Sequence, residues 1–280
     1  MLGCVYASGC VRKDNAANSA HEAVDKSDSL PQSVKLLVKA VTDDDNVRFA
    51  EMVSYPLQRP YPLHDIANAD DMKKYYINIV DDSLRSVISH GDASRWKEFG
   101  WRGWSLDDGR YIWLDDSIYD VQYISQKERN AIDSLTREEV NSLPEVIRKG
   151  WKPVMCLLHP VTGSIYRIDA RDEEPGNDKR DYRLAVYLAN GNLKDLPDQL
   201  ISGKKETEST AGTVTYKFID ADGSDYVIEQ ESPETGNPAL ITRSDSTIQL
   251  QRAYWHELIK RDGHRDKKDK SRHPRDKQKI

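Results

Sequence analysis

The stretch Gly100-Trp-Arg-Gly-Trp104 combines aromatic rings with a guanidinium and is the most unusual part of the sequence. If it forms a strand, alternation places Arg102 and Trp104 on the same face. With Trp113 beyond the following turn, these side chains would form an aromatic wall that binds an acidic or planar ligand. The alternative is core packing, with Arg102 paired to a carboxylate. We favour core packing for the tryptophans, because aromatic residues in a sheet folded over helices are usually buried.

Other polar side chains show no spacing that is typical of catalysis. His64, Asp65 and His90 are candidates for a general base, but their spacing indicates no hydrogen-bonded partner. The sequence motifs of P-loop nucleotide-binding proteins, nucleophile-elbow hydrolases and zinc proteases do not occur. Asp220–Asp225 is similar to a calcium loop but lacks the distal glutamate, so we predict a turn there. The sequence therefore predicts neither an enzyme nor a bound cofactor or metal ion.

The cysteines Cys4, Cys10 and Cys156 form no Cys-x-x-Cys pair, so they do not indicate a zinc site. Cys156 lies in an apolar run, which predicts a buried and inert thiol. Ala7-Ser-Gly-Cys10 resembles the end of a bacterial lipoprotein signal, in which small residues precede a cysteine that becomes lipidated. Leu2-Gly-Cys4 is a second, weaker candidate.

The segment before Cys10 has no basic n-region and its apolar stretch is short, so an ordinary N-terminus is the alternative. A lipidated Cys10 implies the cell envelope, as a periplasmic or outer-membrane lipoprotein, and the polar stretch after it would serve as a tether. Without lipidation we expect a cytoplasmic protein. No apolar run approaches the roughly 20 residues that span a bilayer, which excludes an internal transmembrane helix.

The charge is unevenly distributed along the chain. The net charge is −6, but the last 21 residues hold ten basic and four acidic side chains, which leaves −12 for the rest. An acidic body argues against nucleic-acid binding by the folded part. We expect the basic tail, residues 261–280, to be disordered. It is either a tether to phosphate groups or, as we favour, a solvated terminus.

The positions of apolar residues predict helices in the first half of the chain. Asp45 or Asn46, and likewise Asn68 or Asp70, can cap helices by accepting hydrogen bonds from backbone N–H groups. Three prolines within residues 56–62 predict an irregular or edge segment. We expect helices over about 31–41, 46–53, 72–88 and 125–149, the last interrupted near Pro144.

Strands are predicted between and after these helices. Asp107-Asp-Gly109 lies between aromatic runs, which is typical of a hairpin turn. From Trp151 onward, short strands separated by turn residues predict an antiparallel β-rich region. In it, Arg167 and Arg183 can bridge adjacent strands through Asp169 or Asp181, and such pairs are mostly structural. The expected strands are 96–106, 110–114, 118–124, 154–158, 164–168, 182–188, 213–218, 226–230 and 247–251.

This order of elements predicts an α+β fold. Residues 31–125 resemble the NTF2-like family, in which helices pack on a curved antiparallel sheet to make a cone. The resemblance rests on Phe49-Ala-Glu-Met-Val-Ser-Tyr-Pro-Leu57, the helix at 71–89 and the aromatic strands from Trp96 to Tyr123. We therefore expect four parts: a lipoprotein-like end and spacer (1–30), an NTF2-like domain (31–150), a β-rich domain (151–260) and the basic tail (261–280).

Three functions are compatible with the sequence. The first is a non-enzymatic cell-envelope protein that binds a protein or a small molecule, with Arg102, Trp104 and Trp113 as candidate ligand-binding residues. The second is an immunity or inhibitor protein, because the resemblance includes immunity proteins of bacterial toxin systems and the acidic body would suit a basic toxin. The third is an isomerase or dehydratase that uses the cone pocket. The lack of a catalytic set favours the first.

Overall fold

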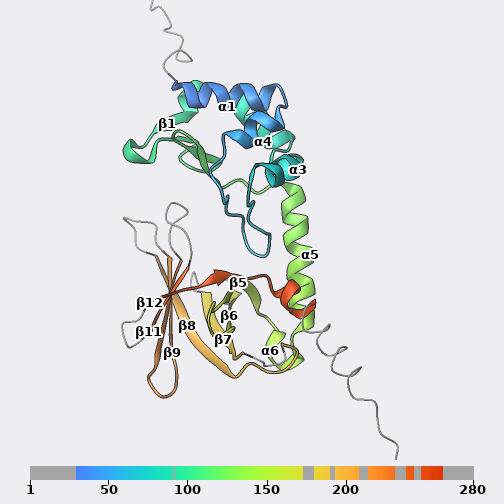
Figure 1. The fold of residues 1–280 in the computed structure, drawn as a ribbon, viewed down its shortest axis with the longest axis vertical. Helices are drawn as coiled ribbons and strands as arrows, with labels where there is room; N and C mark the ends of the chain where they lie inside the picture. Colours follow the sequence, from blue (N-terminus) through green and yellow to red (C-terminus); the bar gives the residue numbers. More distant parts are fainter. Residues whose placement is uncertain are drawn as a thin grey trace, which may run out of the picture.

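The computed structural model describes residues 30–90, 92–172, 180–189, 193–207, 214–230, 238–242 and 247–260. The fold is α+β, with helices and two antiparallel sheets. Figure 1 shows α1, α3, α4 and a small sheet at one end of the molecule, a larger curled sheet at the other end, and α5 running from the first part toward the second.

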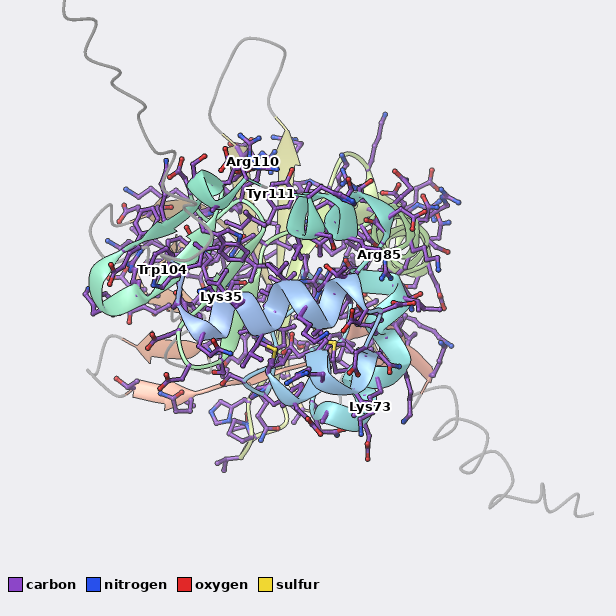
Figure 2. The ribbon with its side chains drawn as sticks, turned by 90° about the horizontal axis from the view of Figure 1, so that it is seen from above. Lys35, Lys73, Arg85, Trp104, Arg110 and Tyr111 are labelled. Carbon is purple, nitrogen blue, oxygen red and sulfur yellow. The ribbon has the colours of Figure 1, made fainter. Side chains whose placement is uncertain are left out.

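Four helices form most of the first part, and three of them begin with a side-chain cap. Asp45 accepts a hydrogen bond from Arg48 N–H at the start of α2, and Asn68 accepts one from Asp71 N–H at the start of α3, as predicted. In Figure 2, α1 lies across this part, with Trp104 on one side and Arg85 on the other. The helices are α1 (Gln32–Thr42), α2 (Asn46–Glu51), α3 (Ala69–Ile79) and α4 (Asp82–Ser89).

The single long helix expected over 72–88 is wrong, because two helices occupy this stretch. Val80 leaves the helical conformation with φ −93° and ψ 76°. The side chain of Asp81 then accepts a hydrogen bond from Leu84 N–H and caps α4. The apolar spacing continues across the break because both helices face the same core, so periodicity alone did not reveal the break.

The small sheet consists of four short strands, and a 3₁₀ turn, η3 (Gly100–Arg102), interrupts the strand that was expected over 96–106. Gly100 and Gly103 have φ values of 61° and 73°, which a continuous strand does not allow. The hairpin turn at 107–109 is confirmed. In chain order the elements are η2 (Ala93–Arg95), β1 (Trp96–Glu98), β2 (Trp104–Leu106), β3 (Ile112–Leu114) and β4 (Ile118–Val121).

The buried residues of β4 do not alternate regularly along the strand. Ile118 and Val121 are the buried residues of this strand, and the pairing with β3 shifts between Trp113 and Leu114. The bulge breaks the two-residue alternation, which the sequence pattern assumes to be regular.

The larger sheet is a meander of neighbouring antiparallel strands. The sequence analysis did not predict two of its strands, β8 and β11. β8 is largely exposed and carries lysines and a glycine, residues that are depleted in strands. Its strands are β5 (Lys152–Leu158), β6 (Ile165–Asp172), β7 (Arg180–Tyr187), β8 (Gln199–Thr207), β9 (Val214–Ile219), β10 (Asp225–Gln230), β11 (Ala239–Thr242), β12 (Thr247–Gln249) and β13 (Gln251–Arg252).

The two edges of this sheet meet at Leu250. The segment predicted as one strand, 247–251, divides there: β12 pairs with β11, whereas β13 pairs with β5 at the opposite edge. The sheet therefore closes on itself (Figure 1), and residues such as Ile168, Leu184 and Phe218 fill its interior as a core. We call β5 to β13 the curled sheet.

The outer face of the curled sheet packs against α5 (Gln126–Ser142), α6 (Glu145–Arg148) and a helix over 255–260. Leu143 and Ile147 belong to the same buried cluster as Cys156, Tyr187 and Trp255. The predicted boundary near residue 150 thus falls within this packing, and the division of the chain into domains stays a prediction. None of the described helices is long and apolar enough to cross a membrane.

Candidate functional site

A loop over residues 56–66 reaches from the first part to the curled sheet. Its ends are joined by a bridge between Leu57 and Ile66, and its prolines leave few N–H groups for sheet pairing, as the sequence predicts. The backbone N–H of Asp65 donates to the hydroxyl of Tyr254 over 3.1 Å. The loop is therefore attached to the last part of the described chain.

Arg59 anchors this loop from within. Its guanidinium makes two hydrogen bonds of 2.8 Å to the carboxylate of Glu128 and donates to the carbonyls of Val121 (2.5 Å) and Tyr123 (2.9 Å). The Arg59 side chain is 1% exposed. Glu128 also accepts from Ser125 N–H in the capping box that begins α5. These contacts join the loop, β4 and α5, so Arg59 has a structural role.

Tyr61 lies at the tip of the same loop and connects it to a buried carboxylate. Its hydroxyl is 2.9 Å from each carboxylate oxygen of Glu139. It also accepts a longer hydrogen bond, 3.4 Å, from the backbone N–H of Trp255. Burial, followed by the negative charge around it, raises the pKa of Tyr61 well above its usual 10. Tyr61 is therefore a hydrogen-bond donor at neutral pH and not a base.

Four charged side chains are buried behind Tyr61, and we call them the charge cluster: Glu139, Arg167, Asp169 and Arg183. Asp169 accepts hydrogen bonds from Arg167 (2.8 Å) on its own strand and from Arg183 (2.9 and 3.0 Å) on the adjacent strand, and the second contact is a bridge that the sequence predicts. Glu139 lies 3.6 Å from Arg167. Burial raises the pKa of Glu139 to about 7, against the attraction of Arg167 and the hydrogen bond from Tyr61.

Aromatic rings cover both cations of the charge cluster. The guanidinium carbon of Arg167 is 4.7 Å from the centre of the Trp255 ring, and that of Arg183 is 4.3 Å from the centre of the Trp151 ring. The Trp255 indole N–H donates to the hydroxyl of Ser142 over 2.8 Å. The cluster thus joins α5, the curled sheet and the helix over 255–260.

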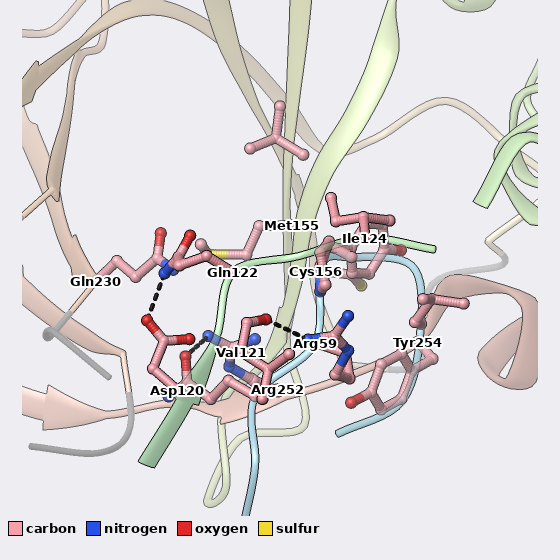
Figure 3. A pocket seen from close by; sticks show the side chains of 15 residues that line it. Arg59, Asp120, Val121, Gln122, Ile124, Met155, Cys156, Gln230, Arg252 and Tyr254 are labelled. Atoms are coloured by element: carbon pink, nitrogen blue, oxygen red, sulfur yellow. Dashed lines mark hydrogen bonds between the residues drawn. The ribbon is translucent and has the colours of Figure 1, made fainter. Parts of the chain in front are cut away.

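A cavity of about 260 Å³ lies in front of Tyr61, between the loop, β4 and the curled sheet. We call it the junction cavity. Figure 3 shows Gln122 and Gln230 on one side of it and Tyr254 on the other. Its lining residues are Gln58, Arg59, Pro60, Tyr61, Leu63, Asp120, Val121, Gln122, Ile124, Val154, Met155, Cys156, Gln230, Arg252 and Tyr254. A second cavity of about 270 Å³, mostly apolar, is lined by other faces of the loop, α3 and α5.

The lining of the junction cavity can form hydrogen bonds but holds no activated nucleophile. Burial raises the pKa of the Cys156 thiol far above its usual range, which keeps it protonated, as expected for an inert thiol. Asp120 accepts a hydrogen bond from Gln122. Arg252 donates to Gln58 over 2.7 Å. Among the described residues of the lining, these amides, hydroxyls and cations suit the recognition of a polar molecule.

One group of described side chains is placed to hold a metal ion. His64 of the loop meets His256 and Glu257 of the helix over 255–260, and one ligand atom from each lies within 4.8 Å of the others. No metal site was expected from the sequence.

The residues predicted to form an aromatic wall lie elsewhere, in the small sheet. Trp104 pairs with Leu114 and packs against the core, whereas Trp113 pairs with Ser105. Neighbouring positions on a strand point to opposite faces, so Trp104 and Trp113 do not share a face and the single wall is not formed. The packing of Trp104 against the buried core favours the interpretation that it is a core residue.

Arg102 lies in the turn η3 instead of a strand, and its guanidinium is 5.1 Å from the centre of the Trp101 ring. Trp101 is 77% exposed. A ligand-binding role for Arg102, Trp104 or Trp113 stays a prediction. Cys10, the lipidation candidate, and the basic tail lie outside the described residues.

Sequence reasoning missed Glu139, Tyr61 and His256 because each acts through a partner that is distant in the chain. Glu139 follows Ala131 and Leu135 at four-residue spacing on α5, which the sequence could have revealed, and the structure shows that it is fully buried. His256 follows Trp255 directly, in the only apolar stretch near the tail. Neither pattern identifies the partner.

The comparisons with known proteins give no family for this chain: no family model matches it, and no curated protein and no solved structure shows significant similarity to it.

Proposed function

We propose that the protein is a non-enzymatic binding protein of the bacterial cell envelope, with a small polar molecule as the occupant of the junction cavity. The observation that carries the proposal is the lining of the cavity. Gln58, Gln122, Gln230 and Arg252 offer hydrogen-bonding groups, and the side chains that could act as acids or bases are already engaged with protein partners. Binding without chemistry is what such a lining supports.

The size and composition of the cavity limit the ligand. A volume of about 260 Å³ is slightly below the roughly 300 to 1,000 Å³ of typical ligand pockets, so the ligand is small. Val154, Met155 and Ile124 add apolar side chains to the same lining. The proposed ligand therefore combines hydrogen-bonding groups with an apolar surface.

The NTF2-like identity of residues 31–125 is part of this proposal. It is supported by the order of the elements, in which α1 to α4 precede and pack against a four-stranded antiparallel sheet. The junction cavity borders this part at β4 and at the loop over 56–66.

The envelope location rests on the small residues before Cys10. Replacing Cys10 by serine is expected to move the protein from the membrane fraction to the soluble fraction of its native host, because an acyl anchor can no longer be attached. Fractionation followed by immunoblotting measures this, with Cys4→Ser as the matched control. If both variants fractionate like the parent protein, the envelope location is wrong.

Replacing Gln122 by tryptophan is expected to weaken the binding of cavity ligands by more than about tenfold, equivalent to about 1.4 kcal/mol. Gln122 is exposed at the cavity, so an indole can enter it without displacing a buried side chain. A screen of polar small molecules identifies ligands as those that raise the melting temperature of the parent protein. Calorimetric titration then compares their affinities for the parent and the variant.

Ala131→Trp is the matched control, because Ala131 lines the second cavity. Ligands of the junction cavity should bind this variant as they bind the parent. Ligands that are lost with Ala131→Trp and kept with Gln122→Trp would place the binding site in the second cavity and contradict the proposal.

A further inference from the structure

Two segments from distant parts of the chain bring together two imidazoles and a carboxylate where the loop over 56–66 meets the helix over 255–260. His64 belongs to the loop over 56–66, and His256 and Glu257 belong to the helix over 255–260. His64 Nε2 is 3.5 Å from Glu257 Oε1, and the centres of the two imidazole rings are 5.6 Å apart. One ligand atom from each residue lies within 4.8 Å of the others.

The protein holds these residues in place through contacts that involve no metal. The hydroxyl of Tyr254 accepts a hydrogen bond from Asp65 N–H, next to His64 in the chain. The ring of Tyr254 also lies 3.8 Å from that of His64, measured between centres. The two segments are therefore attached to each other next to the three ligand residues, which reduces the cost of ordering them around an ion.

One ring nitrogen of His256 faces a carboxylate, as is common for histidines that bind metals. It is 7% exposed, and its Nδ1 is buried without a hydrogen-bond partner among the described residues. Nδ1 faces Glu139 Oε1 at 3.6 Å, and Glu139 is held in turn by Tyr61. Histidines that bind metals through one nitrogen commonly direct the other toward a carboxylate, which orients the ring. This arrangement leaves Nε2 of His256 for the ion.

We propose that His64, His256 and Glu257 form a Zn²⁺ site. Two imidazole nitrogens and one carboxylate oxygen are a donor set that zinc takes, whereas Ca²⁺ and Mg²⁺ prefer oxygen ligands alone. Bonds of about 2.0 to 2.1 Å in a tetrahedron place neighbouring ligand atoms about 3.4 Å apart, close to the 3.5 Å between His64 and Glu257. Three protein ligands leave a fourth position, which faces solvent because the side chains of His64 and Glu257 are 47% and 43% exposed.

Calorimetric titration of the full chain with Zn²⁺ tests the site. The parent for this test carries alanine in place of His21, His264 and His273, which lie outside the described residues, so that these histidines do not bind the ion. We expect one Zn²⁺ per chain, and we expect His64→Ala and Glu257→Gln each to weaken binding by more than about tenfold. Both side chains are partly exposed, so both variants should fold, which circular dichroism checks.

His90→Ala is the control, because His90 follows α4 at the end of that helix and is outside the proposed site. Its Zn²⁺ affinity should equal that of the parent. Titration with Co²⁺ adds a second readout, since a tetrahedral site with nitrogen ligands gives visible absorption that should disappear in His64→Ala. Absence of stoichiometric Zn²⁺ binding by the parent, or equal affinities for the parent, His64→Ala and Glu257→Gln, would overturn the proposal.

Discussion

Replacing Arg167 by methionine is expected to lower the free energy of unfolding by about 3–5 kcal/mol. The Arg167 side chain is 1% exposed and lies between the carboxylates of Asp169 and Glu139 and the ring of Trp255. Methionine fills part of its volume but leaves buried carboxylates with less positive charge nearby. Urea denaturation followed by tryptophan fluorescence measures the change as a lower midpoint at an unchanged slope.

Arg171→Met is the matched control on the same strand. Arg171 also pairs with an aspartate, Asp181 at 2.7 Å, but its side chain is 50% exposed, so its loss should cost less than about 1 kcal/mol. At a pH well above the raised pKa of Glu139, adding Glu139→Gln to Arg167→Met should recover part of the stability, because one of the uncompensated carboxylates is then neutral. A variant Arg167→Met that is as stable as the parent would show that the charge cluster does not depend on this cation.

Replacing Arg59 by methionine is expected to cost a similar amount, about 3–5 kcal/mol, because it leaves the buried carboxylate of Glu128 unpaired. The carbonyls of Val121 and Tyr123 also lose their hydrogen-bond donor. Arg59→Lys should restore only part of the stability, since an ammonium cannot reproduce the two parallel hydrogen bonds to Glu128. Urea denaturation gives the loss of stability.

The loss of Arg59 should also have a local effect, since this side chain anchors the loop over 56–66. Hydrogen exchange is expected to be faster in that loop than in the parent protein. Lys127→Met is the control, because Lys127 is adjacent to Glu128 in α5 but is exposed and donates only a 3.3 Å hydrogen bond to Ile77. Equal stability of Arg59→Met and Lys127→Met would contradict the anchoring role.

The helices and most strands could be predicted from the sequence because short-range forces determine them. Asp45 and Asn68 cap helices through bonds to residues three positions ahead, and the turn at 107–109 depends on its own backbone conformation. Arg183 meets Asp169 because the two are paired across neighbouring strands of a meander, and Arg167 lies two residues before Asp169 on the same strand. Predictions failed where local rules compete, as at Asp81, which starts a new helix within an unbroken apolar pattern.

By itself, the sequence determined an α+β order of elements, an acidic body and a buried, inert Cys156. The tertiary structure alone decided that the curled sheet closes at Leu250, because closure depends on the accumulated twist and register of all its strands. It also decided which distant residues meet: Tyr61 with Glu139, and His64 with His256. Those meetings require the loop over 56–66 to pack against the end of the described chain, and no spacing within the sequence encodes that contact.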